Sequence, residues 1–184
     1  MRLLQTIILC ILVQMNALAQ NQFVRKSTDV LCLVPSATGL VKAIADNDKE
    51  GIVQLGLSSV TGIALNYGLN ACISKDRPEM PLNATWDDHH SFPSTHAMVA
   101  FDGASFLMRR YGWQWGVPAY AVSTYVAWGR VHTNRHDWWD VLAGAAIGAG
   151  SAFIYTRPIA SHDLTIAPVS FGKTGTGVYL SLKF

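Results

Sequence analysis

Four apolar segments, each long enough to form a helix, constrain the fold of this chain more than any other feature. They span residues 52–73, 96–108, 113–128 and 141–155. Half of the 184 residues are hydrophobic and only 14% are charged. The last segment has glycines at positions 144, 148 and 150, and small residues at such spacing allow helices to pack closely. We therefore expect a mainly α protein, a helical bundle that is either water-soluble or partly embedded in a membrane.

The tail of the chain has a different pattern. Residues 164–171 and 177–184 alternate in side-chain polarity, and the residues between them are rich in glycine. This alternation around a turn predicts two antiparallel strands. We expect a small C-terminal β-hairpin, at about residues 164–184, packed beside a helical core of about residues 30–157.

His136 and Asp140 are four residues apart at the start of the last apolar segment. If the chain is helical from about residue 136, the two side chains share one face. The carboxylate can then accept the proton of one ring nitrogen and leave the other nitrogen bare, as in a catalytic triad with histidine as the nucleophile. Arg130 precedes this pair, and its guanidinium can hold phosphate oxygens in a bidentate manner. An ordinary His–Asp pair on a helix surface is the alternative.

A second motif, residues 93–96, reads Pro-Ser-Thr-His and stands immediately before an apolar run. Proline, serine and threonine in this place indicate the start of a helix, whose free N–H groups favour an anion. His96 in the first turn could protonate a leaving oxygen. A plain helix cap is the alternative. Together with Arg77, these residues are what metal-free phosphoryl transfer requires.

The three stretches resemble the motifs of the type 2 phosphatidic acid phosphatase superfamily, which includes bacterial acid phosphatases and vanadium haloperoxidases. The family pattern is Lys-x6-Arg-Pro, then Pro-Ser-Gly-His, then Ser-Arg-x5-His-x3-Asp. The matching residues of this chain, with the family spacing within each motif, are Arg77, Pro78, Pro93, Ser94, His96, Arg130, His136 and Asp140. The similarity extends over about residues 30–157 and implies the helical bundle of that family.

The resemblance also implies a role for each matching residue. His136 would attack phosphorus and form a phosphohistidine, with Asp140 holding its ring. His96 would protonate the leaving group and then activate the water that hydrolyses the intermediate. The phosphate oxygens would be bound by Arg77, Ser94, the backbone N–H of Thr95, and Arg130.

This chain departs from the family pattern at three positions. The family lysine is replaced by Asn70, and Lys75, five residues later, is a possible substitute although a helix would point it elsewhere. Thr95 replaces a glycine, and Gly129 replaces a serine and so lacks its hydroxyl. Loss of one oxyanion donor can lower a rate about 100-fold. We therefore expect an active enzyme that is slow or narrow in its substrates.

Residues 1–19 have the pattern of a secretory signal peptide. A single early charge, Arg2, precedes an apolar core, and the segment ends with Ala17 and Ala19. We expect cleavage after Ala19, export to the periplasm or to the periplasmic face of a membrane, and one domain over residues 20–184. An uncleaved anchor helix is the alternative.

Other features give weaker indications. The formal net charge of +2 does not suggest a nucleic-acid partner. His132, His136 and Asp140 recur every four positions and could imitate a metal site, but spacing alone is a weak sign, and we expect neither a metal nor another cofactor. Cys32 and Cys72 could form a disulfide or remain free thiols.

We therefore expect a metal-independent phosphatase of the cell envelope, acting on a phosphorylated lipid or an isoprenoid diphosphate. A soluble periplasmic acid phosphatase for small-molecule phosphates is one alternative. A vanadate-dependent haloperoxidase and a non-catalytic envelope protein of the same fold are the others. The apolar segments make membrane association possible.

Overall fold

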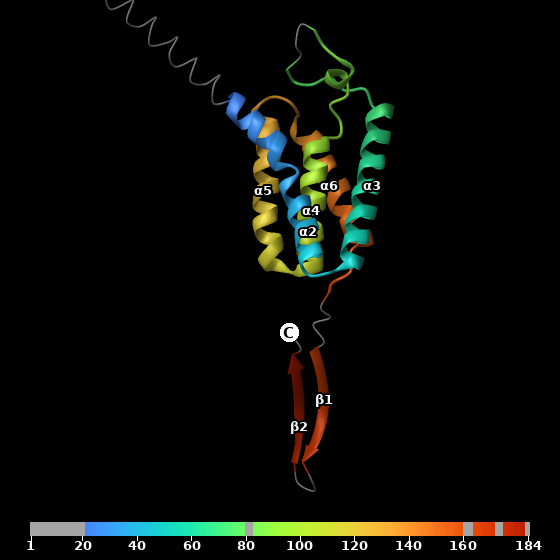
Figure 1. Cartoon of the computed structure of the whole chain (residues 1–184), viewed down its shortest axis with the longest axis vertical. Helices are drawn as coiled ribbons and strands as arrows, with labels where there is room; N and C mark the ends of the chain where they lie inside the picture. The colour runs from blue at the N-terminus through green and yellow to red at the C-terminus, as the bar shows by residue number, and fades with distance from the viewer. Residues whose placement is uncertain (1–20, 80–82, 160–163, 172–174, 183–184) are drawn as a thin grey trace, which may run out of the picture.

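A computed structural model describes residues 21–79, 83–159, 164–171 and 175–182 of the chain. The helix over residues 21–31 leads into five further helices and two strands (Figure 1). Their bounds are α2 Val34–Ala45, α3 Lys49–Cys72, α4 Thr95–Tyr111, α5 Trp113–His132, α6 Trp138–Tyr155, β1 Leu164–Phe171 and β2 Gly175–Leu182, with a short 3-10 helix, η1, at Trp86–His89. The expected helical bundle is confirmed, and each of the four apolar segments lies largely in one helix. The expected signal peptide lies outside the described residues.

Helix α4 is the centre of the bundle and contacts α2, α3, α5 and α6. Its sequence explains this position, because small residues alternate with large apolar ones and allow neighbours on every side. Ala97, Ala100, Ala104, Phe106 and Leu107 are fully buried. The surrounding helices each bury one face against α4 and leave the other face outside.

Two glycines allow α6 to approach α4 at backbone distance. A Cβ atom at Gly144 would lie 2.3 Å from the carbonyl oxygen of Ser94, and one at Gly148 would lie 2.1 Å from that of Met98. Any larger residue at either position would push the two helices apart. The close packing expected from small residues in this segment is thus present, and it brings the start of α6 next to the start of α4.

The outer faces of the bundle are apolar. The stretches Asn21–Ala45 and Lys49–Cys72 are long and apolar enough to cross a membrane, and only 28% of each hydrophobic window is buried inside the protein. On α3, the exposed large hydrophobic residues include Val53, Leu57, Val60, Leu65 and Tyr67. Asn66 and Asn70 of the same helix face inward instead and are buried.

A buried ion pair closes the end of the bundle where α3 begins and α4 ends. Asp48 caps α3 by accepting a hydrogen bond from the N–H of Gly51, and its carboxylate lies 2.5 Å from Nη2 of Arg110. The hydroxyl of Tyr111 donates to the same carboxylate at 2.8 Å. The hydrogen bond from Arg110, with the others, lowers the pKa of Asp48 to about 2. These contacts tie the α2–α3 connection to the end of α4.

The two strands pair antiparallel with each other, with Leu164 opposite Leu182. β1 has the expected bounds, whereas β2 begins at Gly175, two residues earlier than expected. Neither strand contacts any described helix, so the expectation of packing beside the bundle is wrong. Cys32 and Cys72 are both free thiols, one buried and one exposed.

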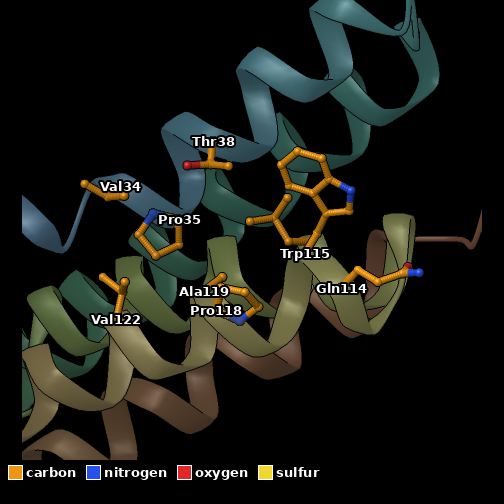
Figure 2. Close-up of a pocket in the computed structure, with 9 residues that line it drawn as sticks. Val34, Pro35, Thr38, Gln114, Trp115, Pro118, Ala119 and Val122 are labelled. Carbon is orange, nitrogen blue, oxygen red and sulfur yellow. The ribbon is translucent and has the colours of Figure 1, made fainter.

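A pocket of about 490 Å³ lies between α2 and α5 (Figure 2). Its lining is mostly apolar and consists of Val34, Pro35, Thr38, Leu107, Gln114, Trp115, Pro118, Ala119 and Val122. On α5, Val122 stands eight residues before Arg130, which is about 12 Å along the helix axis. The pocket is therefore separate from the residues of the three motifs.

Candidate active site

The three predicted motifs meet at one end of the bundle. The N–H of Ser94 donates to the carbonyl oxygen of Asp140 at 2.9 Å, which joins the start of α4 to the start of α6. Nη1 of Arg77 lies 3.5 Å from Nε2 of His136, which joins the loop after α3 to the loop before α6. Residues that are far apart in the sequence thus form one cluster.

His136 is buried, with 4% of its surface exposed, and one ring nitrogen is fixed. Its Nδ1 lies 2.9 Å from the carbonyl oxygen of Ser91, and because a carbonyl can only accept, Nδ1 carries the proton. Nε2 is then the basic nitrogen, and it faces Arg77. Burial lowers the pKa of His136, with Arg130 and Arg77 acting in the same direction and Asp140 opposing them. The ring is therefore neutral at neutral pH.

Asp140 supports this ring from farther away than the sequence suggested. Its Oδ2 lies 3.6 Å from Nδ1 of His136, so the carbonyl of Ser91 is the nearer partner. The hydroxyl of Ser91 donates to the same Oδ2 at 2.5 Å, and Asp137 shares a reciprocal capping box with Asp140 at the start of α6. Burial favours a raised pKa, but the nearby ring of His136 and hydrogen bonds from Lys75 and Ser91 together hold the pKa of Asp140 well below its usual value.

The ammonium group of Lys75 forms ion pairs with two carboxylates at the start of α6. Its Nζ lies 2.5 Å from Oδ2 of Asp137 and 2.6 Å from Oδ1 of Asp140. Burial opposes its charge, but these two carboxylates raise its pKa. Lys75 therefore belongs to the site as a partner of Asp140, and its charge is already matched.

His96 and Arg130 share a carboxylate that the motifs do not contain. Asp29, on the helix over residues 21–31, accepts from Nη1 of Arg130 at 2.6 Å and lies 3.2 Å from Nε2 of His96. Burial, followed by the charge of Arg130, lowers the pKa of His96 to about 4, and Asp29 opposes them. Asp29 was not predicted as a site residue, although it is the one acid between positions 21 and 31, which is a signal that could have identified it.

The departure from the family pattern at Gly129 has a steric reason. A Cβ atom there would lie 2.5 Å from Cγ2 of Thr28 and 3.1 Å from Cγ1 of Val24. The family serine would push the first helix away from α5. The glycine therefore permits the approach that brings Asp29 to Arg130.

The two other departures from the family pattern are Asn70 and Thr95, and asparagine side chains of α3 make hydrogen bonds at both positions. Nδ2 of Asn70 donates to the carbonyl oxygens of His90 at 2.7 Å and Phe92 at 3.2 Å, so this side chain holds the loop before α4. Nδ2 of Asn66 donates to Oγ1 of Thr95 at 2.9 Å, which directs that side chain toward α3. Both residues thus position the start of α4.

Ser94 and Arg130 carry buried polar atoms that have no hydrogen-bond partner within the described residues. These atoms are Oγ of Ser94 and Nε of Arg130. A buried polar group without a partner is unfavourable by about 1–3 kcal/mol, so such atoms commonly mark a place where a ligand binds. Both belong to residues that the family resemblance assigns to phosphate binding.

The carboxylate of Asp88 lies near two guanidinium groups, those of Arg77 and Arg135. Its Oδ1 lies 3.5 Å from Nε of Arg77 and 3.6 Å from Nη2 of Arg135. Hydrogen bonds from the N–H and the hydroxyl of Thr85 hold this carboxylate and lower the pKa of Asp88. Asp88 and Arg135 were not predicted as site residues, although Arg135 directly precedes His136.

His132 does not join His136. Its ring stacks on Trp128 at a centroid distance of 4.6 Å, which holds it on the side of α5. Within the described residues, no three His, Cys, Asp or Glu side chains are arranged to hold a metal ion.

Comparisons with known proteins agree with this geometry. Over 136 residues the chain is 30% identical to the lipid A 4'-phosphatase of Helicobacter pylori, covering 70% of this chain and 67% of that protein. The fold resembles that of Aquifex aeolicus LpxE, with a TM-score of 0.61, 19% identity and coverage of 74% of this chain and 85% of that one.

It also resembles a transmembrane PAP2 type phosphatidylglycerolphosphate phosphatase from Bacillus subtilis, with a TM-score of 0.57, 24% identity and 74% coverage of each chain. Residues 51–161 match the family model of the PAP2 superfamily, and they contain all three motifs. The resemblance inferred from the motifs is confirmed, and this chain is a member of the PAP2 superfamily.

Proposed function

We propose that this chain is a lipid phosphatase that hydrolyses a phosphomonoester through a phosphohistidine at His136, without a metal ion. The observation that carries the proposal is the state of the His136 ring. Nδ1 donates to the carbonyl of Ser91, and the basic Nε2 faces the guanidinium of Arg77 at 3.5 Å. A neutral, fixed imidazole beside a cation is the arrangement that an attacking histidine needs.

In the first step, Nε2 of His136 forms a bond to phosphorus as the bond between phosphorus and the ester oxygen breaks. His96 gives its proton to the leaving oxygen, so the alcohol departs neutral. A phosphate dianion beside His96 raises the pKa of this histidine, which supplies the proton that the free site lacks. In the second step, His96 takes a proton from water, the water oxygen bonds to phosphorus, and His136 is released.

The proposed oxygen-binding groups are Arg77, Arg130, the hydroxyl of Ser94 and the backbone N–H of Thr95. The guanidinium groups supply fixed positive charge where negative charge increases in the transition state. The unpartnered Oγ of Ser94 and Nε of Arg130 support this assignment. Asp140 would stabilise the positive charge that His136 acquires when it is phosphorylated.

A lipid substrate is favoured over a small organic phosphate. The 30% identity to a protein named lipid A 4'-phosphatase supports a lipid phosphate. The apolar outer faces of the bundle also favour a position in a membrane, with the site at the membrane surface. We also propose export and cleavage after Ala19, which would place the site on the periplasmic side.

The test is phosphate release from phosphatidic acid, lipid A and para-nitrophenyl phosphate by detergent-purified protein in excess EDTA. We expect release from a lipid phosphate in EDTA, and a loss of at least 10³-fold in the His136→Ala variant. Rapid acid-free quenching of the reaction should trap a phosphorylated His136, detectable by mass spectrometry. Bromide oxidation with orthovanadate and peroxide would instead indicate a haloperoxidase, and folded protein without either activity would indicate a non-catalytic relative.

A further inference from the structure

We propose that Arg135 supplies the third cation of the phosphate site, in place of the family lysine that is absent at position 70. This inference rests on the proposed phosphatase function and adds one substrate-binding residue to it. The guanidinium of Arg135 would donate from Nε to a non-bridging oxygen of the phosphate that His136 attacks.

The two residues that could replace the lysine are occupied elsewhere. Asn70 carries no charge, and its amide nitrogen donates to the carbonyl oxygens of His90 and Phe92. Lys75 pairs with Asp137 and Asp140 through a single ammonium group. Neither residue can therefore add positive charge to a phosphate in this arrangement.

Arg135 contacts the site at two points. Its carbonyl oxygen accepts from Nη1 of Arg77 at 3.3 Å, and its Nη2 lies 3.6 Å from Oδ1 of Asp88. The same carboxylate oxygen lies 3.5 Å from Nε of Arg77. Asp88 thus aligns two guanidinium groups next to each other, and the next residue in the chain is His136.

Arg135 completes the charge balance of the site. Without it, three cations, Lys75, Arg77 and Arg130, face the four carboxylates of Asp29, Asp88, Asp137 and Asp140. Arg135 shares Asp88 with Arg77 and makes the numbers of cations and carboxylates equal when both histidines are neutral. Its charge therefore removes the net negative charge that would repel a phosphate dianion.

A donor of Arg135 also lacks a partner. Its Nε is buried and makes no hydrogen bond within the described part of the chain, like Nε of Arg130 and Oγ of Ser94. A guanidinium has no acceptor atoms, so only an acceptor group of a ligand or a water can satisfy it. A phosphate oxygen provides such an acceptor.

The experiment compares Arg135→Gln, Arg135→Lys and the control Arg157→Gln, whose exposed side chain follows α6. We expect Arg135→Gln to lower kcat/KM about 10²-fold and to weaken orthovanadate binding about tenfold or more, as for loss of one oxyanion donor. Arg135→Lys should retain more of both, and Arg157→Gln should match the wild type.

The outcomes separate this inference from the proposed function. If His136→Ala is inactive but Arg135→Gln keeps its kcat/KM and orthovanadate affinity within threefold, the function stands and the inference is wrong. Loss of activity with unchanged orthovanadate affinity would also refute a phosphate-binding role. If the wild type hydrolyses nothing, calorimetric titration with orthovanadate still tests the inference by itself. If Arg135→Gln does not fold, Arg135→Lys carries the comparison, because lysine has no donor in the place of Nε.

Discussion

The substitution Gly144→Ala should lower kcat/KM strongly, although Gly144 belongs to none of the three motifs. An alanine Cβ at this position would lie 2.3 Å from the carbonyl oxygen of Ser94, whereas ordinary contact begins at 3.4 Å. The obstacle is backbone and cannot rotate away. The start of α6 must therefore move from the start of α4 by about 1 Å, the difference between these two distances.

This displacement falls between the two halves of the site. The N–H of Ser94 is bonded to the carbonyl of Asp140 directly across the contact. A misplacement of about 1 Å can reduce a rate about 10²-fold. We expect kcat/KM of Gly144→Ala to fall by that factor, with a loss of about 1–3 kcal/mol in the free energy of unfolding from overpacking.

Gly150→Ala is the matched control in the same helix. Among the residues that the structure describes, no heavy atom lies within 4 Å of the place where a Cβ would stand at this glycine. The substitution should leave kcat/KM unchanged and stabilise the protein by about 0.4–1 kcal/mol, because alanine restricts the unfolded chain. Phosphate release and thermal unfolding in one detergent measure both variants. Wild-type kcat/KM in folded Gly144→Ala would refute the argument that this contact sets the geometry of the site.

Three further predictions test other parts of the structure. Ser94→Ala should lower kcat/KM about 10²-fold with little change in Tm, because its hydroxyl has no partner to lose within the described residues. Asp48→Ala should lower the free energy of unfolding by about 3 kcal/mol, because the buried Arg110 then loses the carboxylate with which it pairs at 2.5 Å. The folded variant should keep its activity. Stability should fall as the pH drops from about 6.5 to about 4. Over this range the unfolded chain protonates His96 and the folded chain does not, so the pH dependence of Tm should be shallower in His96→Gln.

The sequence was sufficient to predict the helices and the residues that meet at the site. The motif spacings are local, and His136 and Asp140 do lie near one another, with 3.6 Å between Nδ1 and Oδ2. The expected helix from about residue 136 begins later, at Trp138, so His136 precedes α6 instead of lying in it. The close packing of α6 was also predictable, because glycines four residues apart, at positions 144 and 148, lie on one face of a helix and leave it without side chains.

The partners of the motif residues could not be predicted in the same way. Ser91 contacts His136 through its backbone carbonyl. Every residue has such a carbonyl, so the sequence does not reveal this contact. Asp29 and Asp88 lie outside the motifs, and only the folded chain brings them to Arg130 and Arg77. Lys75 was considered as a phosphate ligand, but the two carboxylates at the start of α6 lie within its reach and hold it.

The Asp29–Arg130 contact joins residues that are 101 positions apart in the chain. During synthesis, the helix that carries Asp29 emerges long before α5, and α6 with Asp140 follows later still. Closing such a long loop has an entropic cost that only the finished packing repays. A chain that stops before Asp140, or that loses the helix over residues 21–31, lacks part of the constellation. The order of synthesis therefore keeps the nascent chain inactive until almost the whole bundle has been made.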